Sequence, residues 1–225
     1  MATAPEPARA ADLPSYGETA VPRTPPTTAR GVRTRAALVR AARRVFERDG
    51  YLDSRLVDIT AEAHCSIGSF YNYFDSKDEV LAAVLDEAEQ DMLHPGTGRV
   101  APEDDPVAVV RESNRAYFEA YLRNARLMGL LQQVALVEPR IRQVQERRNR
   151  AFIARNAAAI LDLQQRGLAD GELDPELAAA ALSGMVSRLA GAHVGHEPGV
   201  AGCTVDELVE VATRLWCNGL GLSGA

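Results

Sequence analysis

A run of polar-tipped side chains in the first third of the chain carries groups that proteins use to bind nucleic acids. It reads Ser66-Ile67-Gly68-Ser69-Phe70-Tyr71-Asn72-Tyr73-Phe74-Asp75-Ser76-Lys77. Hydroxyl, amide and ammonium groups can hydrogen-bond to phosphate oxygens or to base edges. These residue types therefore predict non-covalent recognition of DNA rather than bond-making chemistry.

The first half of this run predicts a helix start that meets base edges. Ser66 is expected to cap the helix, which leaves the next three residues at the end of a recognition helix that usually touches bases. Ile67 could contact a thymine methyl group, and Ser69 could bond to a base or a phosphate. Gly68 would let the backbone approach the duplex closely.

The second half of the run supplies hydroxyls, an amide and a charge. The amide of Asn72 could pair bidentately with adenine. Tyr71 and Tyr73 offer hydroxyl groups, and Lys77 combines its charge with backbone donors at a helix start, which suits a phosphate. We expect these side chains to face DNA rather than to form an ordinary solvated surface.

Other groupings of reactive residues give weaker signals. His193 and His196 have a spacing that zinc accepts, but no other clear set of ligands accompanies them. Cys65, Cys203 and Cys217 lack the CxxC spacing of a thiolate site and are expected to be buried free thiols. The chain has no GxSxG, HExxH, P-loop or Rossmann fingerprint. The sequence thus predicts no metal site, no cofactor and no enzyme activity.

Helices must position the polar run, because apolar residues recur at helical spacing and no alternating strand pattern appears. Asp105-Pro106 and Asp174-Pro175 each place a good N-cap before a proline. Capping boxes are expected at Ser76 with Glu79 and at Thr204 with Glu207. The prediction is an all-α fold of about nine helices, two of which run roughly from Asn124 to Val137 and from Pro139 to Gly167.

Three regions are expected along the chain. Residues 1–30 are rich in proline and alanine and predict a disordered tail. Residues 31–93 predict three short helices and a connecting fourth, with Phe70 and Phe74 in the core and a three-residue break between the second and third helices. That arrangement is typical of a helix-turn-helix. After a Pro/Gly-rich break at Pro95 to Pro102, residues 104–225 predict a larger helical bundle.

The polar run resembles the recognition segment of the TetR family of transcriptional regulators, which typically reads S-x-G-x-F-Y-x-Y-F-x-S-K. The likeness covers roughly residues 33–90. It implies that positions 67–69, 71 and 72 face bases and that Tyr73 and Lys77 hold phosphates. It also implies a homodimer on double-stranded DNA whose C-terminal domains bind a small-molecule effector.

Four positions depart from the family pattern. His64 stands in the turn where the family usually has glycine, and a strained turn is expected because His adopts a positive φ less easily. Cys65 replaces a valine. Arg55 replaces the threonine that usually caps the second helix, so Ser54 is expected to cap it and Arg55 to grip a phosphate. Val57 replaces a polar residue, which reduces the expected base reading by that helix.

The C-terminal region predicts a dimer seam and an effector pocket. Its last helices carry more apolar residues than one helix needs to bury, which suits a two-fold four-helix interface, although an ordinary intrachain core remains the alternative. The expected interface residues are Leu182, Val186, Leu189, Leu208, Val211 and Leu215. The expected pocket residues mix aromatic, flexible and apolar types. They are Tyr117, Phe118, Tyr121, Met128, Leu131, Phe152 and Met185.

The charge distribution agrees with DNA binding despite a net charge of -6. Basic and acidic residues balance over residues 1–80, so the excess of acid belongs to the remainder of the chain. Residues 30–57 contain eight arginines and only three acidic residues. We expect a modest basic patch on each head of the dimer and salt-sensitive binding.

The function that follows is a cytoplasmic, ligand-responsive repressor that leaves a palindromic operator when a small apolar molecule binds. Residues 1–30 lack the apolar core of a signal peptide, and the window from Leu177 to Val194 is too polar for a membrane span. The alternatives are a small-molecule-binding helical protein that has lost or altered DNA binding, and a cofactor-independent helical enzyme.

Overall fold

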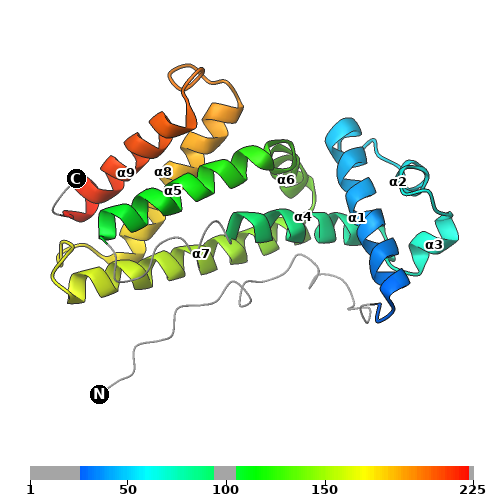
Figure 1. Ribbon diagram of the computed structural model, residues 1–225, viewed down its shortest axis with the longest axis horizontal. Coiled ribbons are helices and arrows are strands. Elements are labelled where there is room, and N and C mark those ends of the chain that lie inside the picture. The colour runs from blue at the N-terminus through cyan, green and yellow to red at the C-terminus, as the bar shows by residue number, and fades with distance from the viewer. Residues whose placement is uncertain (1–25, 94–104, 223–225) are drawn as a thin grey trace. The chain divides into compact units, whose positions relative to one another are not determined.

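The structure is a computed structural model that describes residues 26–93 and 105–222 of the chain. Within those ranges it consists of helices without strands (Figure 1), and the predicted all-α class of about nine helices is confirmed. The helices are α1 (Ala29–Asp49), α2 (Leu56–Glu62), α3 (Ile67–Tyr71), α4 (Lys77–Leu93), α5 (Pro106–Arg123), α6 (Ala125–Val137), α7 (Pro139–Gln165), α8 (Pro175–Val194) and α9 (Val205–Leu220). Residues 1–25 of the predicted disordered tail (residues 1–30) lie outside the described residues, and so does the predicted break at Pro95 to Pro102. The end of the predicted tail is wrong, because α1 already begins at Ala29, where the Thr28 side chain caps it by accepting from the backbone N–H of Gly31.

Local capping chemistry sets most of the helix ends. The side chains of Asp105 and Asp174 accept hydrogen bonds from the second or third backbone N–H of α5 and α8, each ahead of a proline in the first turn. At α9 the capping box of Thr204 and Glu207 is complete in both directions. These predictions are confirmed, and α6 and α7 lie within two residues of their expected ranges.

The expected capping box at α4 forms in only one of its two directions. The hydroxyl of Ser76 accepts from the backbone N–H of Glu79 at 3.2 Å, as predicted. The Glu79 carboxylate reaches back to the backbone N–H of Asp75 instead of that of Ser76. The box is therefore displaced by one residue on its acidic side.

The chain divides into two compact units. The head unit comprises residues 26–90 and 126–147, and so contains α1 to α3, most of α4, α6 and the start of α7. Its core is built from the residues that share the helical stripes expected from the sequence. They are Leu38, Ala42, Val45, Phe46, Ile59, Phe70, Phe74, Val80, Leu81, Val84 and Leu85.

The body unit comprises residues 91–93, 105–125 and 148–222. Within it α5 packs along α9, and α8 packs against both helices. A buried hydrogen bond of 3.2 Å from the Asn114 amide to the Thr213 hydroxyl fixes the register of α5 on α9. The apolar core around Ile160, Ala179 and Leu220 closes the unit from α7, α8 and α9.

Helix α8 has the length and apolar composition of a membrane span, with a mean hydropathy of 1.2 over its best window. A single helix of this kind is weak evidence for a membrane protein, because the core helix of a soluble protein has similar properties. Here α8 buries Ala179, Val186 and Ala190 within the body unit. Its Arg188 forms a two-pronged ion pair with Glu197.

Candidate nucleic-acid interface

A tight turn joins α2 to α3 and is made by an unusual backbone conformation at His64. The φ angle of His64 is +53°, in the left-handed region that favours glycine. The N–H of Cys65 bonds to Thr60 O at 3.0 Å and that of His64 to Ala61 O at 3.1 Å, which is the bonding pattern of a Schellman cap. The turn therefore demands a positive φ of a residue that adopts it less easily than glycine.

Helix α3 begins at a side-chain cap, as predicted. The Ser66 hydroxyl accepts a hydrogen bond of 3.1 Å from the backbone N–H of Ser69. Phe70 is fully buried and packs 5.6 Å from Phe74, centroid to centroid, in the head core. Because these two rings hold the inner face of the helix, the opposite face is left to solvent.

The outer face of α3 presents the side chains that the sequence assigns to base contact. Ile67 is 45% exposed and Tyr71 46% exposed, and Gly68 and Asn72 are exposed beside them. Ser69 is half-buried. The structure thus gathers five expected base-reading positions on one accessible surface of the head unit.

The recognition helix is short and ends before Tyr73. It ends at Tyr71 with Asn72 as its C-cap, because the N–H groups of Tyr73 and Phe74 both turn back to Phe70 O. Tyr73 is half-buried, and a Cβ placed on Gly31 would lie only 3.8 Å from its hydroxyl. The Tyr73 hydroxyl therefore lies beside the first turn of α1.

The Lys77 ammonium is held by the protein's own backbone. Its Nζ donates hydrogen bonds to the carbonyl oxygens of Tyr51 at 2.7 Å, Ser54 at 2.9 Å and Leu52 at 3.3 Å. The Nζ also lies 4.5 Å from the centroid of the Tyr51 ring. Desolvation by burial lowers the Lys77 pKa, partly opposed by the nearby Asp53. This bonding was not foreseen from the sequence.

The start of α2 differs from the sequence prediction. Arg55, not Ser54, is the N-cap residue, and its side chain makes no capping hydrogen bond. The hydroxyl of Ser54 is buried and donates to Tyr51 O at 2.8 Å, so the expected Ser54 cap is wrong. The Arg55 guanidinium pairs with Asp58 at 2.9 and 3.1 Å, and this hydrogen bonding holds the pKa of Asp58 below its ordinary value.

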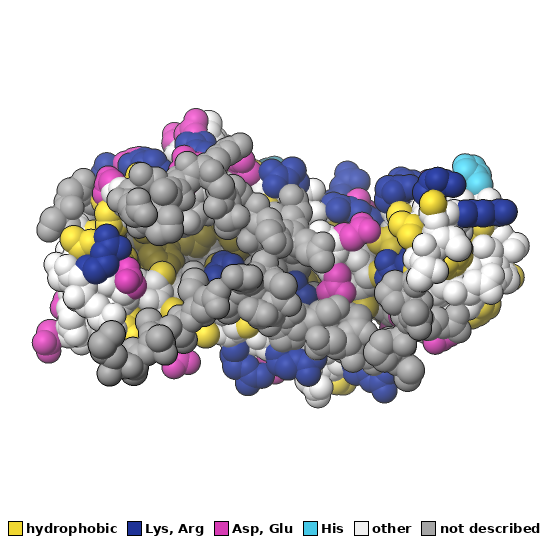
Figure 2. Space-filling model, turned by 60° about the horizontal axis from the view of Figure 1, so that its bottom comes forward, with side chains coloured by type: hydrophobic (Ala, Val, Ile, Leu, Met, Phe, Trp, Pro, Cys, Tyr) yellow, Lys and Arg dark blue, Asp and Glu magenta, His cyan; other side chains and the backbone are white. Residues whose placement is uncertain are grey.

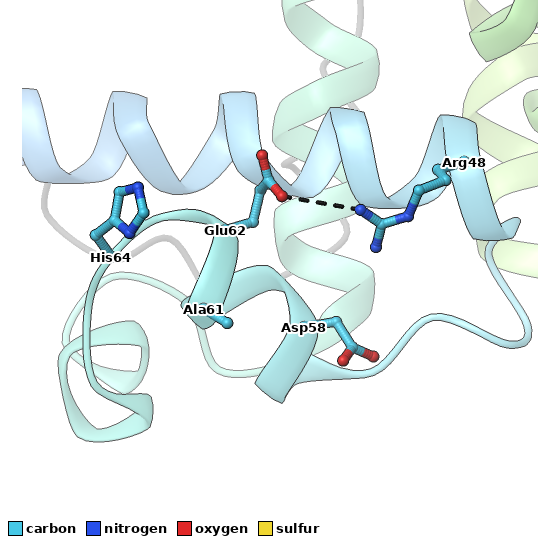
Figure 3. A pocket seen from close by; sticks show the side chains of 5 residues that line it. All are labelled: Arg48, Asp58, Ala61, Glu62 and His64. Atoms are coloured by element: carbon cyan, nitrogen blue, oxygen red, sulfur yellow. Dashed lines mark ion pairs between the residues drawn. The ribbon is translucent and has the colours of Figure 1, made fainter.

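Other arginines of the basic patch also meet carboxylates. Glu62 of α2 pairs with Arg44 at 2.7 Å and with Arg48 at 3.8 Å. Arg48, Glu62 and His64 help to line an open pocket of about 360 Å³ between α1 and α2 (Figure 3). Figure 2 shows Lys and Arg side chains gathered on the surface of the α1–α3 region, close to a histidine. The expected basic surface is present, but the carboxylates of Asp58 and Glu62 on α2 pair with several of its arginines.

The expected effector residues do not all belong to the same unit. Tyr117, Phe118 and Tyr121 form a ladder on α5, with ring centroids 6.3 and 6.0 Å apart. Phe118 and Tyr121 are buried, and burial raises the pKa of Tyr121. Half-buried Phe152 and Met185 lie in the same body unit, whereas buried Met128 and Leu131 lie in the head unit.

A half-buried arginine beside Phe152 was missed by the sequence reasoning. The Arg155 guanidinium carbon lies 4.9 Å from the Phe152 ring centroid, and desolvation lowers the Arg155 pKa. The sequence could have predicted this contact, because Phe152 and Arg155 are three residues apart and side chains at that spacing are neighbours on a helix. By contrast Arg115, also in the body unit, pairs with Asp206 at 2.7 Å.

The expected dimer residues separate into two groups in the body unit. Val186 and Leu208 are buried within the single chain, and Leu182 and Leu189 are half-buried. Val211 and Leu215 remain 51% and 47% exposed on α9. Of the six, only Val211 and Leu215 therefore leave about half of their apolar surface open to a second copy.

The histidine pair considered for zinc lies at the end of α8. His193 Nδ1 is 3.4 Å from Val200 O, and His196 adopts a φ of +54° just after the helix. Across residues 26–93 and 105–222, no three His, Cys, Asp or Glu residues gather as a metal ion would require. Nothing in that part of the chain points to metal chemistry.

Comparison with known proteins places this geometry in a family. Residues 38–84 match the bacterial regulatory proteins of the tetR family. The transcriptional regulator TtgR of Pseudomonas putida is 27% identical over 163 residues, covering 69% of this chain and 78% of its own. The transcriptional repressor DhaR of a Mycobacterium species is 36% identical over 97 residues, covering 43% and 48%.

Solved structures agree on the fold. GusR of Salmonella enterica superposes with a TM-score of 0.68 at 20% identity, covering 87% of this chain and 98% of its own. A complex of SmeT with triclosan gives a TM-score of 0.67 at 20% identity, with 85% and 93% covered. With the capped α3 and its exposed outer face, residues 38–84 form a helix-turn-helix domain of the tetR family of bacterial regulatory proteins, and the chain has the fold of TetR-family transcriptional regulators.

Proposed function

We propose that the protein is a homodimeric repressor in the bacterial cytoplasm that binds a near-palindromic operator and leaves it when a small apolar molecule binds. The observation that carries the proposal is the outer face of α3, where exposed polar and apolar tips flank Gly68 while Phe70 anchors the inner face. A helix so presented fits the major groove.

Within this proposal the roles on α3 follow from exposure. Ile67, Ser69, Tyr71 and Asn72 read bases, and Gly68 allows close backbone approach. Phosphates bind around these positions and set the register on the duplex without reading sequence. The Tyr73 hydroxyl, beside the first turn of α1, is the proposed phosphate donor nearest to α3.

Effector binding is proposed for the body unit. Tyr117, Phe118 and Tyr121 form an aromatic cluster on α5, and the structurally similar SmeT was solved in complex with triclosan. SmeT is described as the repressor of a multidrug efflux pump. If effector and DNA favour different conformations, each must weaken the binding of the other by the same factor.

The experiment that tests the proposal is selection of bound sequences from a random duplex library, followed by anisotropy titration. Asn72→Ala is expected to relax base preference at one position by about 1–3 kcal/mol, whereas Tyr73→Phe weakens binding to all sequences. Asn149→Ala, an exposed asparagine on α7, is the matched control. If the wild-type protein selects no sequence, or if Asn72→Ala behaves like the control, the assignment to α3 fails.

One observation favours the second candidate, a ligand-binding protein with weakened DNA binding. Arg44, Arg48 and Arg55 each meet a carboxylate of α2 or of the α1 end. The random-duplex selection separates the two candidates, because a pure sensor would enrich no duplex.

A further inference from the structure

The loop that joins α1 to α2 is folded around a single ammonium group. Between Gly50 and Arg55 the chain directs three carbonyl oxygens, those of Tyr51, Leu52 and Ser54, at Lys77 Nζ. Lys77 is the first residue of α4, so the contact joins segments about 25 residues apart. The loop is short and contains no helix or strand of its own.

The bonding capacity of the ammonium is fully used by these contacts. An ammonium has three N–H donors, and the three carbonyl partners lie at 2.7, 2.9 and 3.3 Å. The side chain is half-buried, and burial lowers the Lys77 pKa. A hydrogen bond from this group to a phosphate would require it to release one of the carbonyls.

Neighbouring groups reinforce the same loop. The Tyr51 ring contacts the Lys77 ammonium, 4.5 Å from its centroid, and the core residue Phe46, whose ring centroid is 5.8 Å away. The Tyr51 hydroxyl donates to the Asp78 carboxylate. The buried Ser54 hydroxyl donates to Tyr51 O, which Lys77 also binds. Lys77 and Asp78, at the start of α4, thus bind the loop through its backbone carbonyls and through the Tyr51 side chain.

The position of this loop determines where the recognition helix lies. Ser54 is followed directly by Arg55, the N-cap of α2, and α2 leads through the His64 turn into α3. The loop is the only covalent link between α1 and α2, so releasing its carbonyls would free the start of α2 from α4. A misplacement of about 1 Å in such a constellation is enough to weaken recognition.

We propose that Lys77 is a positioning residue for operator binding, holding the α1–α2 loop on the start of α4 through three carbonyls, and that it does not itself bind a phosphate. The inference rests on the proposed function, since it concerns how the head binds an operator. It revises the role that the family resemblance implies for Lys77.

Lys77→Arg and Lys77→Met separate the two roles. Arginine keeps the charge and is the better phosphate ligand, but its planar fork cannot direct three N–H groups into one cluster of carbonyls. A positioning role predicts that both variants lower operator affinity, on the order of tenfold, the loss expected when charged hydrogen bonds are broken. A phosphate role predicts that Lys77→Arg binds as well as the wild type.

The salt dependence of binding gives an independent readout. One phosphate contact contributes about 0.9 to the slope of log affinity against log salt, so loss of one contact in each of two subunits would reduce the slope by about 1.8. The positioning role predicts a change in Lys77→Met well below that amount. A role confined to stability would leave the affinity of the folded protein unchanged, so unchanged affinity in both variants would also overturn the proposal.

Ser54→Ala provides the coupling test, because Ser54 is 4% exposed and its hydroxyl bonds to Tyr51 O within the loop. The positioning role predicts that Ser54→Ala lowers affinity and that its effect is not additive with that of Lys77→Met. The positioning role would be overturned if the losses of affinity in Ser54→Ala and Lys77→Met were additive. It would also be overturned if Lys77→Met reduced the salt slope by about 1.8 while Lys77→Arg kept the wild-type affinity. Thermal melting checks that each variant is folded. If Lys77→Met does not fold, the operator affinities of Lys77→Arg and Ser54→Ala distinguish the positioning role from the phosphate role. Failure of the wild-type protein to select an operator would instead count against the proposed function.

Discussion

The exposed apolar residues of α8 and α9 allow a quantitative prediction about the dimer. Leu177 on α8 is 70% exposed, and Val211 and Leu215 on α9 are 51% and 47% exposed. Exposed Ala181 and Gly184 on α8 leave room for a second helix to approach. We predict that two copies bury these faces against each other and that Leu215→Asp separates them.

The magnitude follows from how much of Leu215 remains to be buried. Complete burial of a leucine side chain contributes about 2 kcal/mol, so the exposed half contributes about 1 kcal/mol in each subunit and about 2 kcal/mol in the dimer. Aspartate adds the cost of placing two carboxylates in an apolar seam, at least a further 2 kcal/mol or so. The dimer dissociation constant should therefore rise at least about a thousandfold.

Sedimentation velocity at micromolar protein concentration measures the fraction of dimer directly. Operator titration shows whether the affinity for DNA falls as the dimer dissociates. Leu136→Asp is the matched control, because Leu136 is a more exposed leucine, at 81%, on α6 rather than on the predicted seam. The control should stay dimeric. A Leu215→Asp protein that remains folded and dimeric, or a Leu136→Asp protein that dissociates equally, would refute the assignment of the seam to α8 and α9.

Two further predictions concern the backbone and the caps. His64→Gly should raise the free energy of unfolding, measured by chemical denaturation, by about 0.5–1 kcal/mol, because glycine accepts the +53° φ of the turn. Ala63→Gly is the control and should lower that free energy, because Ala63 has a φ of -85°. Equal changes in the free energy of unfolding for the two variants would contradict this account. Hydrogen bonds from Thr204 hold the Glu207 pKa below its ordinary 4.5, so this contribution to stability is present above that pH and lost as the pH falls through the folded-state pKa. The melting temperature of the wild type should therefore fall toward that of Glu207→Gln between about pH 6 and about pH 3, and a constant difference would argue against the cap.

The elements that the sequence predicts well are those fixed by neighbours in the chain. The caps at Asp105, Asp174 and Thr204 depend on residues two or three positions away, so their chemistry is readable directly. The same holds for Ser66, whose hydroxyl caps α3. The inner rings of α3 follow from helical spacing alone.

What the sequence could not predict depends on contacts between distant segments. The carbonyl cluster around Lys77 forms only when the α1–α2 loop folds onto α4, and Glu62 meets Arg44 only once α2 packs on α1. Periodicity also identified an apolar set on α8 and α9 without saying which side faces inward. Val186 therefore proved to be buried in the chain while Leu215 was left exposed.

The ion pairs of the head sharpen the expectation about affinity. Arg44, Arg48 and Arg55 are more than half exposed and each is paired with a carboxylate. Such surface pairs contribute only about 0–1 kcal/mol, so a DNA phosphate can compete for the arginine at small cost. The released carboxylate then lies near a phosphate, and the repulsion offsets part of the gain. A single head is therefore expected to bind weakly, and useful operator affinity should come from two heads joined through the body unit, where the second contact is intramolecular.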